Sequence, residues 1–360
     1  MLQEFHQSLG ARFLAVTGHP AVADYGDAAV EYNALRQSAG VLDLSFRGRL
    51  CLVGADRARF LHGQVTNDVK KLAPGQGCYA ALTTLKGKME ADLNIACLAE
   101  ELLLDFEPGL TAAITARLER YIVADDVQLV DAAPHYGLLS VQGPAAAAVV
   151  RALGVFIEIP AARHASVKVS DPMLGDLYLV NLPRLNTTGF DLFVPNDSLG
   201  AVADKLIAAA KQAGGRAAGW TALETARIEA GIPRYGADMD ETNLPLECGI
   251  ESRAIVYNKG CYIGQEVINR VHSFGRVTRE LCGLWLPATL PTLPVRGDKL
   301  LHDGKEVGAI TSASWSPAWQ THLALGYVRR EANQPGTELR LRIADTEVTA
   351  QVTPLPFAKP

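Results

Sequence analysis

A single cysteine stands in an unusual chemical setting at residues 259–266, which read KGCYIGQE. Cys261 follows Lys259 by two residues and lies between Gly260 and Gly264, which allow a tight backbone turn. The segment EVINRVH comes next and has the apolar spacing of a helix. A helix N-terminus and a nearby ammonium both favour thiolate over thiol, because each stabilises the anion. The pattern therefore indicates a reactive thiol at Cys261, poised by Lys259.

The same residues also allow a purely structural interpretation. Cys261 would then be a small buried residue in a glycine-rich turn, with Lys259 solvated and Gln265 and Glu266 in the first turn of the helix. No histidine adjoins the cysteine, so a complete nucleophile–base pair is not visible in the sequence. His272, eleven residues further on, is a distant candidate partner. The residue types alone leave both interpretations open.

A second constellation precedes this segment in RIEAGIPRYGAD, residues 227–238. Glu229 lies late in a predicted helix, where the dipole disfavours a negative charge, so its carboxylate needs a partner. Arg227 could supply that partner in a structural ion pair. Alternatively, the carboxylate could accept two parallel hydrogen bonds from the flat edge of a pterin or guanine ring. The spacing does not decide between the two.

Length, composition and charge exclude several classes of protein. A chain of 360 residues with 48% hydrophobic residues predicts two or three domains. The formal net charge of −5, with acidic and basic residues interspersed, argues against direct, strong nucleic-acid binding and against an anionic membrane surface. No apolar run approaches the roughly 18 residues of a membrane span, and the N-terminus does not read as a secretory signal.

Cysteine and histidine usage gives a similar result. The six cysteines are widely spaced and form no CxxC pair, which disfavours both a disulfide framework and a tetrahedral zinc site. The eight histidines show no ligand spacing, so no metal site is predicted. We expect a cytoplasmic protein in reducing surroundings, in which the cysteines other than Cys261 are small core residues.

The elements that must position these residues alternate between strands and helices. Short apolar runs bounded by turn signals predict strands in GRLCLVG, CYAALTTL, ADLNIACLA, LLLDF, LLSVQG, DLYLVNL and FDLFV. Helical spacing is found in DRARFLHGQV, LTAAITARLERY, AAAAVVRAL, LGAVADKLIAAAKQA and TALETARIEA. After about residue 276 the segments are short and β-rich, with Asp303-Gly304 as a hairpin turn signal. The pattern predicts an α+β region over residues 1–275 and a C-terminal β-barrel domain over residues 276–360.

The octapeptide, with Arg270 and Gly275 after it, closely resembles the signature of the YgfZ family of folate-binding proteins, which are tied to iron–sulfur enzyme maintenance and tRNA modification. Further segments resemble that family and its relative, the glycine-cleavage T protein. They are LHGQVTNDV (61–69), the turn at Gly87-Lys88, VQGP (141–144), TTGFDLFV (187–194) and RIEAGIPRYG (227–236). The resemblance runs from about residue 30 to residue 330, and the octapeptide is its most specific part.

This resemblance implies an aminomethyltransferase-like α+β fold of intertwined folate-binding subdomains, followed by a β-barrel. The implied ligand is tetrahydrofolate or a one-carbon derivative. Glu229 matches the carboxylate expected to hold the pterin, and Asp92 stands where the T protein has an acidic residue near the reacting folate nitrogen. The other implied site residues are the folate-binding candidates Arg184 and Arg270 and the motif residues Gly260, Tyr262, Gly264, Gln265 and Glu266 around Lys259 and Cys261.

The function implied by the octapeptide is that of a tetrahydrofolate-binding accessory protein, which assembles or repairs iron–sulfur clusters in client enzymes. These clients include radical enzymes that modify tRNA, so the link to tRNA would be indirect. Cys261 would contact a cluster, a sulfur species or a transient adduct. Because a cubane cluster normally uses about four thiolates, contact with a cluster would be shared or transient.

The alternative is a tetrahydrofolate-dependent aminomethyl or methyl transferase of the T-protein type, with Asp92 as the acid/base or charge-stabilising group. The local sequence is Glu90-Ala91-Asp92, where the T protein usually has two consecutive aspartates, and this departure argues against aminomethyl transfer. A folate store or scaffold without chemistry is a third hypothesis.

Overall fold

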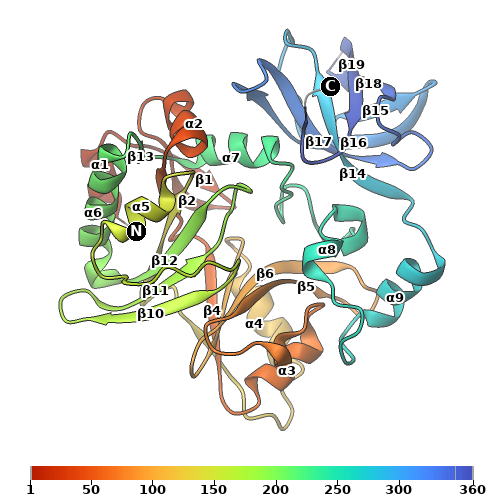
Figure 1. Ribbon diagram of the computed structural model, residues 1–360. Coiled ribbons are helices and arrows are strands. Elements are labelled where there is room, and N and C mark those ends of the chain that lie inside the picture. The colour runs from red at the N-terminus through yellow and green to blue at the C-terminus, as the bar shows by residue number, and fades with distance from the viewer. Residues whose placement is uncertain (1, 345, 359–360) are drawn as a thin grey trace. The chain divides into compact units, whose positions relative to one another are not determined.

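The computed structural model describes residues 2–344 and 346–358, and these fall into two compact units (Figure 1). The first unit contains the chain up to Leu82, Ala91–Leu223 and Asn258–Tyr262. The second contains Thr83–Glu90, Glu224–Tyr257 and the chain from Ile263 onward. Each unit is therefore assembled from three separate segments of the chain. The two intertwined subdomains within residues 1–275 stay a prediction. The domain boundary between residues 275 and 276 stays a prediction.

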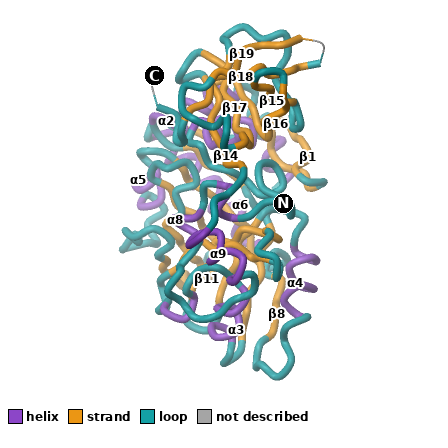
Figure 2. Tube along the Cα trace, turned by 90° about the vertical axis from the view of Figure 1, so that its right-hand side faces the viewer, coloured by secondary structure: helices purple, strands orange, loops and turns teal. Residues whose placement is uncertain are grey.

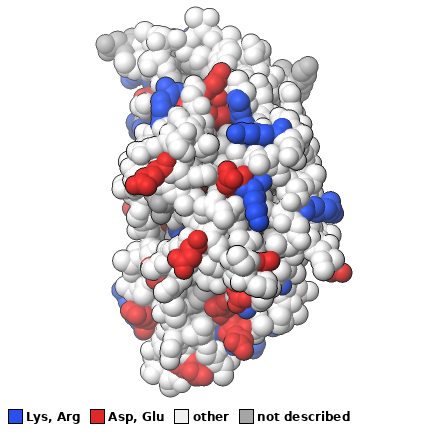
Figure 3. All heavy atoms as spheres, turned by 90° about the vertical axis from the view of Figure 1, so that its left-hand side faces the viewer, with Lys and Arg blue, Asp and Glu red and all other residues white. Residues whose placement is uncertain are grey.

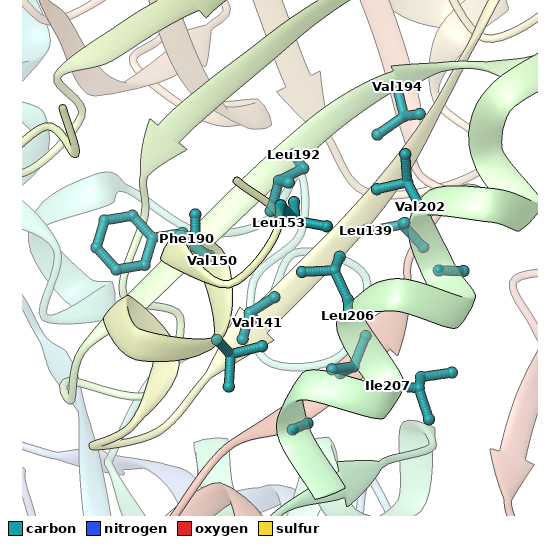
Figure 4. Close-up of a cluster of buried hydrophobic side chains, with 14 of the residues drawn as sticks. Leu139, Val141, Val150, Leu153, Phe190, Leu192, Val194, Val202, Leu206 and Ile207 are labelled. Atoms are coloured by element: carbon teal, nitrogen blue, oxygen red, sulfur yellow. The ribbon is translucent and has the colours of Figure 1, made fainter. Parts of the chain in front are cut away.

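A six-stranded sheet forms one layer of the first unit. Its strand order is β10 (Ser166–Asp171), β11 (Gly175–Asn181), β12 (Gly189–Pro195), β9 (Tyr136–Gln142), β3 (Gly40–Asp43) and β13 (Arg216–Ala217). Helices α5 (Ala146–Arg151) and α6 (Leu199–Gln212) pack against its central strands. Figure 4 shows the apolar core between them, in which Leu139 and Leu192 from the sheet lie near Leu206 from α6. Burial of these side chains is the main force that holds the helices on the sheet.

A second sheet, of five strands, carries Asp92. Its order is β5 (Gly77–Thr83), β6 (Met89–Cys97), β7 (Leu102–Phe106), β4 (Gly48–Val53) and β8 (Gln128–Asp131). Helix α4 (Thr111–Glu119) packs on β4 and β8, and α3 (Arg57–Gln64) adds Phe60 and Leu61 to the same core. The first half of β6 alternates buried and partly exposed residues, which places Asp92 on the less buried face.

The remaining elements of the first unit lie mostly near the N-terminus, where sequence patterns gave no prediction. They are α1 (Gln3–Ser8), the hairpin of β1 (Arg12–Val16) and β2 (His19–Asp24), α2 (Ala28–Gln37), and the short 3-10 helices η1 (Val69–Lys71) and η2 (Asn196–Ser198). Helix α7 (Trp220–Glu229) begins in the first unit and ends in the second.

The second unit is built on a closed barrel whose strand order is β14 (Arg279–Leu286), β17 (Thr321–Arg329), β16 (Lys305–Ser316), β15 (Lys299–His302), β18 (Glu338–Ile343) and β19 (Thr346–Thr353). These strands are orange in Figure 2. Leu284, Leu300 and Leu341 fill the barrel core. Three short helices precede the barrel, namely η3 (Pro245–Cys248), α8 (Glu251–Ala254) and α9 (Gln265–Phe274). The predicted C-terminal barrel is thus confirmed.

The Asp303-Gly304 turn joins β15 to β16 with positive φ at both residues, 49° and 76°, as a two-residue hairpin of this type requires. Within the described residues, no helix is both long and apolar enough to cross a membrane. The same residues contain no group of three or more His, Cys, Asp or Glu side chains placed to hold a metal ion. On the face drawn in Figure 3, basic and acidic side chains are interspersed.

Candidate functional site

The thiol of Cys261 is exposed, and this separates it from the other cysteines of the chain. All six cysteines are free; Cys78 is partly buried, and the other four are buried. Burial raises the pKa of Cys78 to about 12 and that of Cys282 to about 12, so neither ionises near neutral pH. The interpretation of Cys261 as a small buried residue is therefore wrong, because its side chain faces solvent.

Lys259 fixes the chain two residues before the thiol. Its ammonium donates hydrogen bonds to the backbone carbonyls of His62, Val65 and Asn67, at 2.6, 2.6 and 2.7 Å. These carbonyls lie at the C-terminal end of α3 and just beyond it, where a helix leaves acceptors unsatisfied and favours a cation. All three ammonium protons are thereby used.

The environment of Lys259 changes its protonation. Burial lowers the pKa of Lys259 to about 8, against a smaller opposing effect of Asp68. The interpretation of Lys259 as a solvated residue is wrong. The hydrogen bonds of Lys259 go to carbonyl groups, so its ammonium could stabilise the Cys261 thiolate only through space. This stabilisation of the thiolate stays a prediction.

Tyr262 fixes the chain on the other side of the thiol. Its side chain is buried, and the ammonium of Lys259 lies 4.9 Å from the centre of its ring. The residues before and after Cys261 are thus held by packing and charge while the thiol itself is presented to solvent.

The segment that follows Tyr262 turns into α9 through a left-handed residue. Gly264 has φ of 88° at the N-terminal cap of α9. A Cβ at this position would lie 2.6 Å from Thr84 O and 2.7 Å from Thr83 Oγ1. The predicted role of Gly264 in a tight turn is confirmed, and Gln265 and Glu266 occupy the first turn of α9 as expected.

Glu229 ends α7 with a buried carboxylate. Ser316 Oγ donates a hydrogen bond to Glu229 Oε1, while the same hydroxyl accepts one from Trp319 N. Arg227 instead binds Asp238 and Glu224. The structural interpretation of an Arg227–Glu229 ion pair is therefore wrong, and the buried carboxylate accepts a hydrogen bond from Ser316.

Asp92 lies on β6 opposite a phenol from the neighbouring strand. Tyr79 on β5 donates its hydroxyl proton to Asp92 Oδ2 at 2.9 Å. A carboxylate fixed in this way can act as an acid/base group or stabilise a positive charge in a reacting ligand. Nothing in the sequence singled out Tyr79, because its proximity to Asp92 depends on strand pairing.

The two arginines proposed as folate ligands differ in their surroundings. Arg184 is largely buried and binds Asp191 at 3.0 Å and Asp105 at 2.9 Å. Burial alone would raise the pKa of Asp105, but Arg184 and Arg47 hold the pKa of this carboxyl well below its ordinary value. Arg184 thus has a structural role inside the first unit. Arg270 is exposed on α9. Folate binding by either arginine stays a prediction.

Comparison with known proteins shows the family to which the chain belongs. The model of the GCVT N-terminal domain matches residues 2–259, and that of the glycine cleavage T-protein C-terminal barrel domain matches residues 279–359. The chain belongs to the glycine cleavage T-protein family. An aminomethyltransferase of Thermus thermophilus is 30% identical over 99% of this chain and 97% of its own length. One from Ralstonia pickettii is 30% identical over 99% and 96%.

The fold of this T-protein-family chain also matches a solved structure. The glycine cleavage system aminomethyltransferase T from Bartonella henselae superposes with a TM-score of 0.88 over 99% of this chain and 97% of that one, at 24% sequence identity. This likeness confirms the predicted aminomethyltransferase-like fold. The family models and the relatives at 30% identity confirm the resemblance to the T protein at the level of the family.

Replacing Lys259 by Met tests the anchor of the thiol segment. We expect the Lys259→Met variant to lose about 1–3 kcal/mol in free energy of unfolding, because three hydrogen bonds from a charged donor are removed. The folded pKa of about 8 lies below the ordinary 10.5, so the unfolded state binds more protons between these values. The difference between wild type and variant should therefore grow as pH rises from about 8 to 10.5, as measured by urea unfolding. Lys168→Met removes an exposed ion pair and is the control, so its free energy of unfolding should differ little from that of wild type. Equal stability of wild type and Lys259→Met would show that Lys259 does not anchor the segment around Cys261.

Gly264→Ala tests the turn into α9 against a matched glycine. Gly249 also has positive φ, at 70°, but nothing lies within 4 Å of a Cβ placed there. Both alanine variants carry backbone strain, whereas only Gly264→Ala forces a clash. We expect Gly264→Ala to be less stable than Gly249→Ala by about 1 kcal/mol or more in thermal or urea unfolding. Equal losses would show that the space around residue 264 is not limiting.

Proposed function

We propose that this chain is a tetrahydrofolate-binding protein of the T-protein family in which the exposed thiol of Cys261 serves iron–sulfur client enzymes. The anchored segment carries this proposal: Lys259 and Tyr262 are held in place while Cys261 faces solvent. A thiol that only filled space would be covered, as the thiols of the four buried cysteines are. This arrangement supports a YgfZ-type role in cluster assembly or repair, and through such clients in tRNA modification.

Folate binding is supported by the family and by two carboxylates with distinct surroundings. Glu229 is buried and would accept the paired N–H groups of a pterin edge. The two oxygens of a carboxylate can accept both hydrogen bonds, whereas an amide has only one acceptor oxygen. Asp92, oriented by Tyr79, would lie near the reacting nitrogen of the folate. Bound tetrahydrofolate, or a one-carbon derivative of it, supplies the ability to accept or give a one-carbon unit.

The second candidate function is one-carbon transfer itself, as an aminomethyl or methyl transferase. The names of the matched relatives favour it over the accessory role, and the Tyr79–Asp92 pair offers an acid/base group. One-carbon transfer by Asp92 would give the exposed thiol of Cys261 no role. The two functions therefore differ in which residue is essential, Cys261 or Asp92.

The proposed partners follow from the first function. They are a folate and client iron–sulfur enzymes, with tRNA reached through those clients and no strong direct nucleic-acid binding. A cytoplasmic location is part of the proposal, because a functional free thiol needs reducing surroundings. A cluster would meet Cys261 only transiently, since one thiolate cannot hold it.

Glu229→Gln tests the folate site. The variant keeps the shape of the side chain but loses the charge, so we expect the dissociation constant for tetrahydrofolate to rise by about tenfold or more, as measured by anaerobic calorimetry. Glu347→Gln is the matched control, because Glu347 is an exposed barrel carboxylate paired with Arg342. Unchanged affinity in Glu229→Gln would remove Glu229 from the folate site.

Complementation of a deletion strain separates the two functions. We expect Cys261→Ser to fail to restore iron–sulfur enzyme activities and thiolated tRNA, because serine cannot supply a thiolate. Cys282→Ala, which removes a buried barrel cysteine, should restore both. Rescue by Cys261→Ser together with failure of Asp92→Asn would refute the accessory role and support one-carbon transfer.

A further inference from the structure

A cavity of about 270 Å³ lies between the two sheets of the first unit. The five-stranded sheet supplies one wall: Cys51 on β4 pairs with Leu103 on β7 and with Val130 on β8. Paired residues of antiparallel strands share a face, so these three apolar side chains lie side by side. Their strand neighbours Leu50 and Leu104 point the other way, into the core that α3 and α4 cover. The wall is thus the face of the sheet that these helices leave open.

Aromatic side chains of the six-stranded sheet form the opposite wall. Tyr178 on β11 pairs with Phe193 on β12, and Tyr136 begins β9 beside them. The rings of Tyr136 and Tyr178 meet edge to face with their centres 5.8 Å apart. Tyr178 already attracts a cation, because the ammonium of Lys168 lies 5.4 Å from the centre of its ring. The wall therefore offers electron-rich rings as well as apolar surface.

One carboxylate joins the two walls. Glu101 lies in the turn between β6 and β7 and lines the cavity. Burial raises the pKa of the Cys51 thiol on one wall and of the Tyr178 hydroxyl on the other; Lys168 partly opposes the shift at Tyr178, and the charge of Glu101 adds to both shifts. Among the described residues that line the cavity, Glu101 is the only carboxylate, and no lysine or arginine accompanies it.

The cavity is separate from the carboxylates assigned to folate. Its lining includes neither Asp92 nor Glu229. Leu103 and Phe193 also line the adjoining void, which measures only about 10 Å³ and lies beside the buried Asp105. A void of that size holds one water at most. A ligand of the cavity would therefore be a second ligand of the first unit.

We propose that this cavity binds a small amine with an apolar body, such as an arylalkylammonium ion. The aliphatic and aromatic walls would bury the body, while Glu101 would pair with the ammonium and the tyrosine rings would stabilise it further. The volume is just below the range of about 300–1,000 Å³ typical of ligand sites, which limits the ligand to a small molecule. Glu101 would repel an anion of the same shape. The inference goes beyond the proposed function, because it involves neither Cys261 nor the folate.

Calorimetry on the full chain near pH 7 tests the charge preference with three probes of similar shape: phenethylamine, phenethyl alcohol and phenylacetate. The amine is protonated at this pH. We expect it to bind at least about tenfold more tightly than phenylacetate, with the alcohol between them. Equal affinities for the three probes, or no binding of phenethylamine, would overturn the proposal.

Glu101→Gln tests the carboxylate against its sequence neighbour. The variant should reduce the preference for phenethylamine over phenylacetate to less than about threefold, because the negative charge is removed. Glu100→Gln is the matched control, since Glu100 is exposed and does not line the cavity. It should keep the wild-type preference. An unchanged preference in Glu101→Gln would remove this carboxylate from the site and contradict the proposed ligand class.

Val130→Trp tests the location. Val130 is 42% exposed at the cavity, so a larger side chain there fills the space without displacing a buried residue, and phenethylamine should bind at least about tenfold more weakly. Val123→Trp, at a residue 89% exposed and outside the lining, should bind it as wild type does. Thermal unfolding confirms that both variants fold. Wild-type binding by Val130→Trp would place the amine elsewhere and overturn the proposal.

Tetrahydrofolate gives the independent readout. Both Glu101→Gln and Val130→Trp should bind it with wild-type affinity, because the cavity lies apart from Asp92 and Glu229. Loss of tetrahydrofolate binding in both variants would show that the cavity belongs to the folate site, and the separate amine site would be refuted.

Discussion

The ammonium of Lys259, bound to three backbone carbonyls, is the interaction on which the arrangement of the thiol segment depends. It closes the end of α3, where helix carbonyls lack partners, and it holds a distant loop at the same time. Removing that charge from water is costly, which is why its pKa falls, and the hydrogen bonds offset part of this cost. Cys261 itself is exposed, while Lys259 and Tyr262 on either side of it make the contacts described above.

The same principle of buried charge governs the rest of the first unit. Arg184, Arg47 and Asp105 form one buried network of ion pairs inside the first unit. Buried pairs of this kind specify an arrangement as much as they stabilise it, since a charge left without its partner would be strongly unfavourable. Glu229 is also buried, and its carboxylate accepts a hydrogen bond from the hydroxyl of Ser316.

Family membership and local geometry point to different uses of one fold. The T-protein family supplies the two layers of the first unit and the barrel, and its named relatives are aminomethyltransferases. The segment 259–262 carries an anchored, exposed thiol, and the proposed accessory role depends on it. A fold can host more than one chemistry in this way, because the chemistry resides in a few side chains.

The sequence by itself determined the α+β class, the C-terminal barrel, most strands from residue 48 onward and the glycine turn into α9. These depend on periodicity and turn chemistry, which act over a few residues. The relation to the T protein came from the resemblance of short motifs. Only the tertiary structure decided that Cys261 is exposed, that Lys259 binds carbonyls, that Arg227 turns from Glu229 to Asp238, and that Tyr79 meets Asp92. Each of these is a choice of partner, often between residues far apart in the chain: Lys259 and His62 are 197 positions apart. The spacing of residues in a sequence does not encode such contacts, because they are set by how sheets and helices pack.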